Sequence, residues 1–132
     1  MDPVTFTTSI ATLLKNIVDV LGPTDIVGHD NDPELGDLVI LAAFYRDVNY
    51  LVLSSSHPPT FSIVQALLRC QSTQRELLDL LRDIGYGRIK RSPKGRDRMR
   101  YAVNLYLKRG KLSRAQKAHR EAVLLLRDIA ME

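Results

Sequence analysis

The side chains that could act as nucleophiles, general bases or metal ligands are few and widely spaced in this chain of 132 residues. Cys70 is the single cysteine, and the three histidines are His29, His57 and His119. Catalytic pairs and zinc sites need such residues together, and no histidine has a histidine or cysteine at the spacing of metal ligands. We therefore interpret the three histidines as surface or loop residues and Cys70 as a buried structural thiol.

Two further patterns resemble ligand-binding loops but do not match them. Asp25, Asp30, Asp32 and Glu34 lie close together, but their spacing does not match a calcium-binding loop. The segment GYGRIKRSPKG at 85–95 contains glycines, but it lacks the GK[ST] ending of a phosphate-binding loop. We predict a protein that is not an enzyme and that needs no metal and no cofactor.

Positive charge is concentrated in residues 88–120, which hold thirteen Lys or Arg and one acid, Asp97. Residues 1–85 contain five bases and eleven acids, a net charge of −6, whereas residues 86–132 contain fourteen bases and four acids, a net charge of +10. Such asymmetry concerns partners and not fold. Three interpretations stay open: a solvated face that balances the acidic half, a surface for anionic lipid, or a nucleic-acid contact. Nucleic acid is the weakest of them, because few aromatics are interleaved with the bases and no helix–turn–helix signal is present.

The segments that carry the residues named above have an apolar residue at every third or fourth position. This spacing predicts helices. The first is expected at about 4–21 after Asp2-Pro3, and the second at about 34–54 after Asp32-Pro33. The inward stripes are Phe6, Ile10, Leu13, Leu14, Ile17, Val18 and Leu21 in the first, and Leu35, Leu38, Leu41, Ala42, Tyr45, Val48 and Val52 in the second. The apolar run 38–44 could be a buried strand on local grounds, but its length and the start signal before it favour a helix.

Three more helices are expected in the rest of the chain. The third begins at Pro59 or Thr60 and ends at Gly85, the fourth starts near Arg96, and the fifth covers about 113–130 with Ser113 as a possible cap. Gly110 either separates the last two or is tolerated as a kink. The stripe of the third is Ile63, Leu67, Cys70, Gln74, Leu77, Leu78, Leu81 and Ile84. The fourth carries the apolar residues Met99, Val103, Leu105 and Leu107, and the residues of the fifth expected to face inward are Ala115, Ala118, Ala122, Leu125 and Leu126. The sequence thus predicts an all-α fold, an antiparallel bundle of four to five amphipathic helices in one domain, 1–132.

The first helix has two interpretations. Its apolar stripe is that of an ordinary core helix, but an amphipathic helix at the terminus of a bundle could also leave it and enter a bilayer. The residues that would insert are Val4, Phe6, Ile10, Leu13, Leu14 and Ile17. The N-terminus lacks the basic region and the small-residue cleavage site of a signal peptide, so none is expected. No apolar run of about 18 residues occurs, so no permanent membrane span is expected. The single cysteine indicates a reducing, intracellular setting.

Three motifs in this order resemble the helical N-terminal domains of fungal NOD-like receptors, the HeLo-like and SesA-like families. Met1-Asp2-Pro3 precedes an apolar helix, Leu67 and Cys70 are followed by Glu76-Leu77, and the basic stretch carries the aromatic–alanine pair Tyr101-Ala102. The aromatic residue of that pair is commonly Trp in the family, and here it is Tyr101. The likeness covers about three quarters of the chain, and residues 22–33 have no counterpart in it.

The resemblance implies a domain at the start of a longer receptor that acts in regulated cell death or strain incompatibility. In the HeLo-like branch, oligomerisation frees the first helix to permeabilise the plasma membrane, so we expect self-association and a cytoplasmic protein recruited to that membrane. The basic residues expected to contact anionic lipid or a partner are Arg88, Lys90, Arg91, Lys94, Arg96, Arg98 and Arg100. The alternatives are a soluble adaptor that binds a receptor or another protein without membrane activity and, less favoured, a nucleic-acid-binding domain.

Overall fold

The computed structural model describes residues 1–21, 36–55, 57–85 and 95–132, which form helices and contain no strand. The helices are α1 (Pro3–Leu21), α2 (Gly36–Ser54), α3 (Phe61–Asp83) and α5 (Gly95–Met131). The predicted all-α bundle is therefore confirmed, and the run at 38–44 lies inside a helix. Leu35 and the acidic residues of the first linker lie outside the described residues, as does His29.

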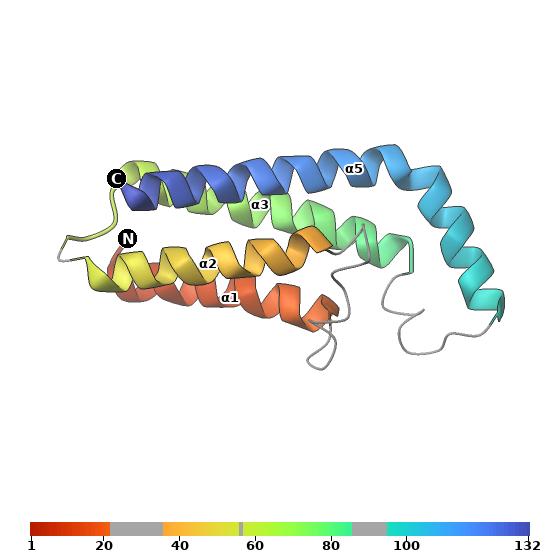
Figure 1. Cartoon of the computed structure of the whole chain (residues 1–132), viewed down its shortest axis with the longest axis horizontal. Coiled ribbons are helices and arrows are strands. Elements are labelled where there is room, and N and C mark those ends of the chain that lie inside the picture. The colour runs from red at the N-terminus through yellow and green to blue at the C-terminus, as the bar shows by residue number, and fades with distance from the viewer. Residues whose placement is uncertain (22–35, 56, 86–94) are drawn as a thin grey trace.

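The four helices run antiparallel in chain order (Figure 1). α1 and α3 lead away from the end of the molecule where both chain termini lie, and α2 and α5 lead back toward it (Figure 1). α2 packs against α1 and α5, and α5 packs along α3, whereas α1 and α3 contact each other only weakly. The bundle is therefore closed on three sides and loosely joined along the fourth, between α1 and α3.

Local signals fix the ends of two helices as predicted. The Asp2 carboxylate accepts a hydrogen bond from the backbone amide of Thr5 at 2.7 Å, and this bond lowers the pKa of Asp2. At α3, the Thr60 hydroxyl accepts from the amide of Ile63 at 3.4 Å. The chain leaves α3 through Gly85 at φ +87°, a left-handed conformation that glycine adopts without strain.

The predicted stripes of the first three helices form the core. All eight predicted residues of α3 are buried, including the polar Gln74, and so are all six of the residues predicted for the second helix that the structure describes. The α1 residues Phe6, Ile10, Leu13 and Ile17 are buried, whereas Leu14 and Val18 are half-buried. Burial of such side chains contributes about 1.5–3 kcal/mol each relative to exposure, so these faces hold the bundle together.

The predicted fourth and fifth helices are one continuous helix, α5, of 37 residues. Ser113 is therefore not a cap, and Gly110 is a helical residue whose carbonyl accepts from the Arg114 guanidinium at 3.3 Å. A single glycine costs a helix only about 1 kcal/mol and, with no proline between 95 and 131, nothing else interrupts it. Figure 1 shows the first turns of α5 running at an angle to the rest of the helix, which lies along α3.

Two predictions about the inward face of this last helix were wrong. Leu125 is 47% exposed, because Ala122, Val123 and Leu126 set the buried register and only one of the three consecutive leucines at 124–126 can share it. His119, predicted at the surface, is fully buried, because it follows Ala115 by four residues and precedes Ala122 by three on the core-facing side. His57, in contrast, is exposed as predicted.

Candidate functional site

The first turns of α5, residues 95–111, form a distinct surface element that we call the arm. None of its described side chains is buried, and Leu112 is the first buried residue of α5. Tyr101 and Leu105 are half-buried and are the arm residues that pack against the core. Met99, Val103 and Leu107, the other apolar residues named for this segment, are exposed, because the arm leans away from the bundle and meets it along one edge only (Figure 1).

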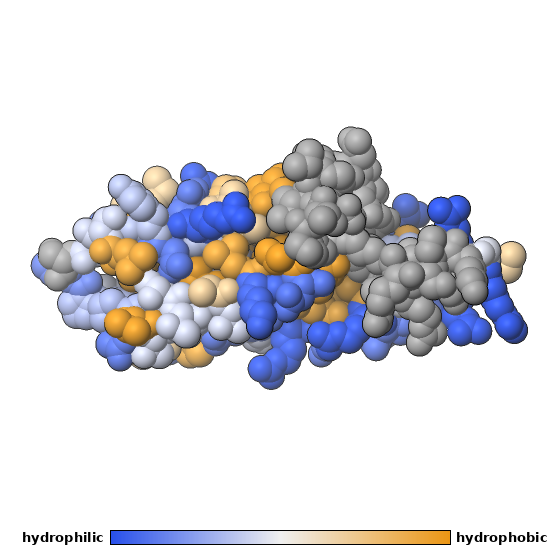
Figure 2. Space-filling view, turned by 90° about the horizontal axis from the view of Figure 1, so that it is seen from below, coloured by the Kyte–Doolittle hydropathy of each residue, from blue (hydrophilic) through white to orange (hydrophobic). Residues whose placement is uncertain are grey.

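The arm carries a dense set of basic side chains. Five of them are exposed and Lys108 is half-buried, and none forms an ion pair with a described residue. In the space-filling view, hydrophilic residues project around the end of the molecule where the arm lies (Figure 2). The basic residues of the arm are Arg96, Arg98, Arg100, Lys108, Arg109 and Lys111.

The structure places three of the seven basic residues predicted to bind lipid or a partner. Arg96, Arg98 and Arg100 are exposed on the arm, while Arg88, Lys90, Arg91 and Lys94 lie outside the described residues. Within the described residues, the positive surface expected from the sequence therefore begins at the first turn of α5. Such a surface attracts anionic groups over roughly a Debye length, about 8–10 Å at moderate salt.

The six residues predicted for membrane insertion do not share one environment. Phe6, Ile10, Leu13 and Ile17 belong to the core, Leu14 is half-buried, and Val4 is 74% exposed. Insertion through this stripe therefore requires α1 to separate from α2 and α3. No helix among the described residues is long and apolar enough to cross a membrane.

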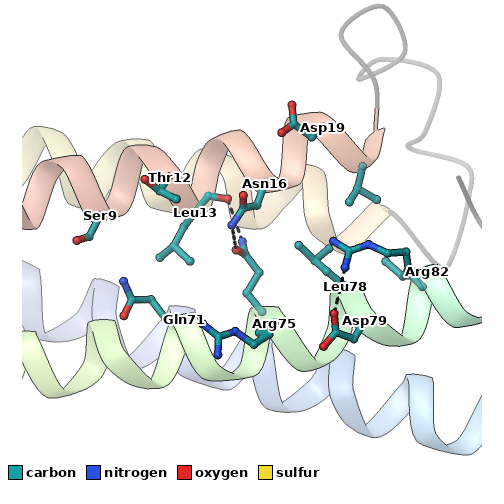
Figure 3. A pocket seen from close by; sticks show the side chains of 13 residues that line it. Ser9, Thr12, Leu13, Asn16, Asp19, Gln71, Arg75, Leu78, Asp79 and Arg82 are labelled. Atoms are coloured by element: carbon teal, nitrogen blue, oxygen red, sulfur yellow. Dashed lines mark hydrogen bonds and ion pairs between the residues drawn. The ribbon is translucent and has the colours of Figure 1, made fainter.

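An open groove of about 770 Å³ runs between α1 and α3. Ser9, Thr12 and Asn16 of α1 face Gln71 and Arg75 of α3 across it (Figure 3). The one ion pair on its rim is an exposed Arg82–Asp79 contact at 3.3 Å within α3. Leu13, Leu78 and Leu81 also line the groove, and α1 and α3 contact each other only weakly along this seam.

Gln74 makes the principal polar contact across the seam. Its side-chain nitrogen donates to the Leu13 carbonyl at 2.9 Å, and its oxygen accepts from the Asn16 amide at 3.1 Å (Figure 3). Gln74 is 1% exposed and its bond to the Leu13 carbonyl is buried, whereas its bond to the half-buried Asn16 lies at the edge of the groove. Sequence reasoning placed Gln74 on the buried face of α3 but gave it no partner, because the pairing depends on how α1 lies against α3.

A second buried polar cluster connects α2, α3 and α5. His119 lies 3.2 Å from the Tyr45 hydroxyl through Nε2 and 3.0 Å from the Thr73 hydroxyl through Nδ1. The buried Cys70 thiol interacts electrostatically with Tyr45 in the same cluster. The cluster joins three helices and lies too deep to meet a substrate. Its signal in the sequence is the spacing of Leu112, Ala115, His119, Ala122 and Leu126, a helical stripe interrupted by one polar residue.

Burial governs the protonation of this cluster. It lowers the pKa of His119 to about 4 and raises the pKa of Cys70 to about 12, and it raises the pKa of Tyr45 as well. All three groups are therefore neutral at pH 7. A thiol in this state is a poor nucleophile, which agrees with the interpretation of Cys70 as a structural residue.

The described residues contain no group of three or more His, Cys, Asp or Glu side chains that could hold a metal ion. Comparison of the chain with protein-family models, with curated proteins and with solved structures finds no match. The arm and the seam are thus the structural features that bear on function.

Proposed function

We propose that this bundle is a signalling domain of fungal regulated cell death that docks on anionic membranes through the arm and perturbs them through α1. The observation that carries the proposal is the concentration of exposed bases on the arm, where none pairs with a described acid. Each base near an anionic leaflet contributes roughly 1 kcal/mol of attraction. Arg96, Arg98 and Arg100 together therefore contribute about 3 kcal/mol, and the other three bases of the arm add to this attraction.

The seam between α1 and α3 supports the second part of the proposal. α1 has a buried apolar face, weak contact with α3, and an open polar groove beside it. A helix held in this way can separate at a smaller free-energy cost than one packed on both sides. Once separated, it would offer Phe6, Ile10, Leu13 and Ile17 to the boundary between headgroups and acyl chains, the position that amphipathic helices occupy.

The resemblance to fungal receptor domains supplies the biological setting of the proposal. It supports an N-terminal position in a longer receptor and oligomerisation on activation. In that setting the bundle is the resting form, with the apolar face of α1 covered, and activation would uncover it. Docking and release are separate steps, and they use residues of different helices, α5 for docking and α1 for release.

Flotation with lipid vesicles tests the docking step. The wild-type chain is expected to float with vesicles rich in phosphatidylserine and not with neutral phosphatidylcholine vesicles. Replacing Arg96, Arg98 and Arg100 by Glu should abolish flotation, because attraction to the leaflet becomes repulsion. Equal flotation with neutral and anionic vesicles, or none with either, would contradict the proposal.

A further inference from the structure

Four large apolar side chains stand exposed on the arm among its bases. Met99 is 72% exposed, Val103 52%, Tyr106 77% and Leu107 71%. Single exposed apolar side chains are common on protein surfaces, but four such side chains within nine residues of one helix form a patch. We call these four residues the arm stripe.

Helical geometry places the arm stripe away from the core. Met99, Val103 and Tyr106 follow one another by four and three residues and so share one face, with Leu107 beside it. Tyr101 and Leu105, the arm residues that pack against the core, lie four apart on a different face. The arm thus has two apolar faces, and only one of them is covered by the bundle.

We propose that the arm stripe enters the boundary between headgroups and acyl chains of an anionic bilayer, with the arm lying in the plane of the membrane. This inference rests on the proposed docking function and adds an apolar contact to the electrostatic one. Bases flank the stripe along the helix, at Arg100 and Lys111 on one side and at Arg98 and Arg109 on the other, and Arg96 lies in line with it one turn before Met99. Apolar residues between cationic flanks are the pattern of helices that lie in a membrane interface.

Charge selects a bilayer over a second copy of the chain as the occupant. Pairing two arms through their stripes would bring six bases of one against six of the other, with Asp97 as the single acid in each arm sequence. The bases of two paired arms would repel each other, whereas the headgroups of phosphatidylserine neutralise such bases. An anionic leaflet therefore satisfies both the apolar stripe and the bases around it.

The chain has no tryptophan, so a single substitution creates a specific fluorescent reporter. Tyr106→Trp places the reporter in the arm stripe, and Tyr50→Trp places a matched one at a 71% exposed position of α2. With anionic vesicles, Tyr106→Trp is expected to shift its emission to the blue and to lose most of its intensity to brominated acyl chains. Tyr50→Trp is expected to change in neither respect.

Flotation of the same samples separates the two proposals. If both variants float but Tyr106→Trp shows no shift and no quenching, the arm stripe does not enter the bilayer, while docking through charge survives. If neither variant floats with anionic vesicles, docking itself fails, and this inference fails with it. A blue shift of Tyr106→Trp that grows with protein concentration in the absence of lipid would assign the stripe to a second copy and overturn the inference.

A polar version of the arm stripe provides the complementary test. Replacing Met99, Val103 and Tyr106 together by Gln leaves every base in place and alters exposed positions only, so the fold should be retained by circular dichroism. Affinity for anionic vesicles is expected to fall about tenfold or more, because the apolar contribution is removed. Unchanged affinity in a folded variant would overturn the inference.

Discussion

The imidazole Nε2 of His119 lies 3.2 Å from the hydroxyl oxygen of Tyr45, a hydrogen bond that joins α5 to α2 inside the core. On its other side, Nδ1 lies 3.0 Å from the Thr73 hydroxyl, which donates its hydrogen to the Arg69 carbonyl at 2.8 Å. From this bond we assign Thr73 as the acceptor of Nδ1–H and Nε2 as the acceptor of the Tyr45 hydroxyl. His119 is a neutral imidazole that uses both nitrogens to connect three helices.

This arrangement predicts that the bundle loses stability in mild acid. The unfolded chain binds a proton at His119 below pH 6.5, but the folded chain does so only below about pH 4. The unfolded state therefore binds more protons in this window, and the free energy of unfolding should fall by up to about 3 kcal/mol as the pH drops from 6.5 to 4. Urea unfolding at a series of pH values measures this change in the free energy of unfolding.

The exposed His57 provides the control for that experiment. His57→Gln should leave the pH profile unchanged, whereas His119→Gln should flatten it above pH 5, where the carboxylates are still largely ionised. A wild-type stability that stays constant between pH 6.5 and 5 would contradict the assignment of His119 as a buried neutral group. Tyr45 and Cys70, the other titratable groups of the cluster, carry no charge in this range.

The contact made by Gln74 predicts a specific weakening of the seam. Gln74→Leu removes the bonds to the Leu13 carbonyl and the Asn16 amide and should lower the free energy of unfolding by about 1 kcal/mol. Amide exchange in α1 should accelerate about fivefold if the whole effect falls on local opening. Gln71→Leu, in the same groove, is the control and should change neither quantity. Unchanged exchange of α1 in Gln74→Leu would show that this contact does not hold the helix.

The continuity of α5 predicts that Gly110 is replaceable. An added Cβ at Gly110 meets no atom within 4 Å, so Gly110→Ala should stabilise the bundle by about 0.5–1 kcal/mol through helix propensity. Gly85→Ala should have the opposite sign, destabilising by about 1 kcal/mol, because Gly85 has φ +87°. Thermal unfolding of the two variants measures both effects, and a destabilised Gly110→Ala would indicate that the helix breaks there.

A reversible tether tests whether α1 must separate to act on membranes. Substituting Ile10 by Asp would be uninformative, because Ile10 is fully buried and a charge there would unfold the bundle. Thr12→Cys with Gln71→Cys instead places one thiol on each helix of the seam for a bismaleimide that contains a disulfide. Cys70, buried with its pKa raised to about 12, should stay unlabelled.

The tethered protein is expected to float with anionic vesicles but not to release their contents. Cleaving the linker with a reductant should restore the release of vesicle contents. The single variant Thr12→Cys, labelled with the same reagent, should release vesicle contents both before and after reduction. Leakage from the tethered protein equal to that from the reduced one would show that α1 acts without leaving α3, or takes no part.

Much of this fold is predictable because apolar periodicity reports burial directly. The stripes that contain Tyr45 and Gln74 faced inward as expected, since each follows one helical face with several aliphatic neighbours. The register of α5 was not predictable from Leu124, Leu125 and Leu126, which offer three equivalent faces. The burial of His119 depends on Tyr45 and Thr73, residues 74 and 46 positions earlier in the chain, and no local pattern shows such partners.

The candidate site divides in the same way. The concentration of bases was evident from charge counts alone, but the exposure of Met99, Val103 and Leu107 was not, because the apolar spacing of the arm is the same as that of a buried helix. Only the angle at which the arm leaves the bundle distinguishes the two (Figure 1). The seam was equally hidden, since Ile10 and Leu13 have the spacing of a fully packed helix while α1 contacts α3 weakly.

The partition of two charge-matched variants between buffer and vesicles tests the central claim most directly. One variant carries Glu at Arg96, Arg98 and Arg100 of the arm, and the other carries Glu at Arg69, Arg75 and Arg82, which are exposed on α3. With vesicles of increasing phosphatidylserine content, the arm variant should lose affinity by about a hundredfold or more, and the α3 variant should keep most of it. Equal losses in the two variants, or binding that does not depend on phosphatidylserine, would contradict docking through the arm.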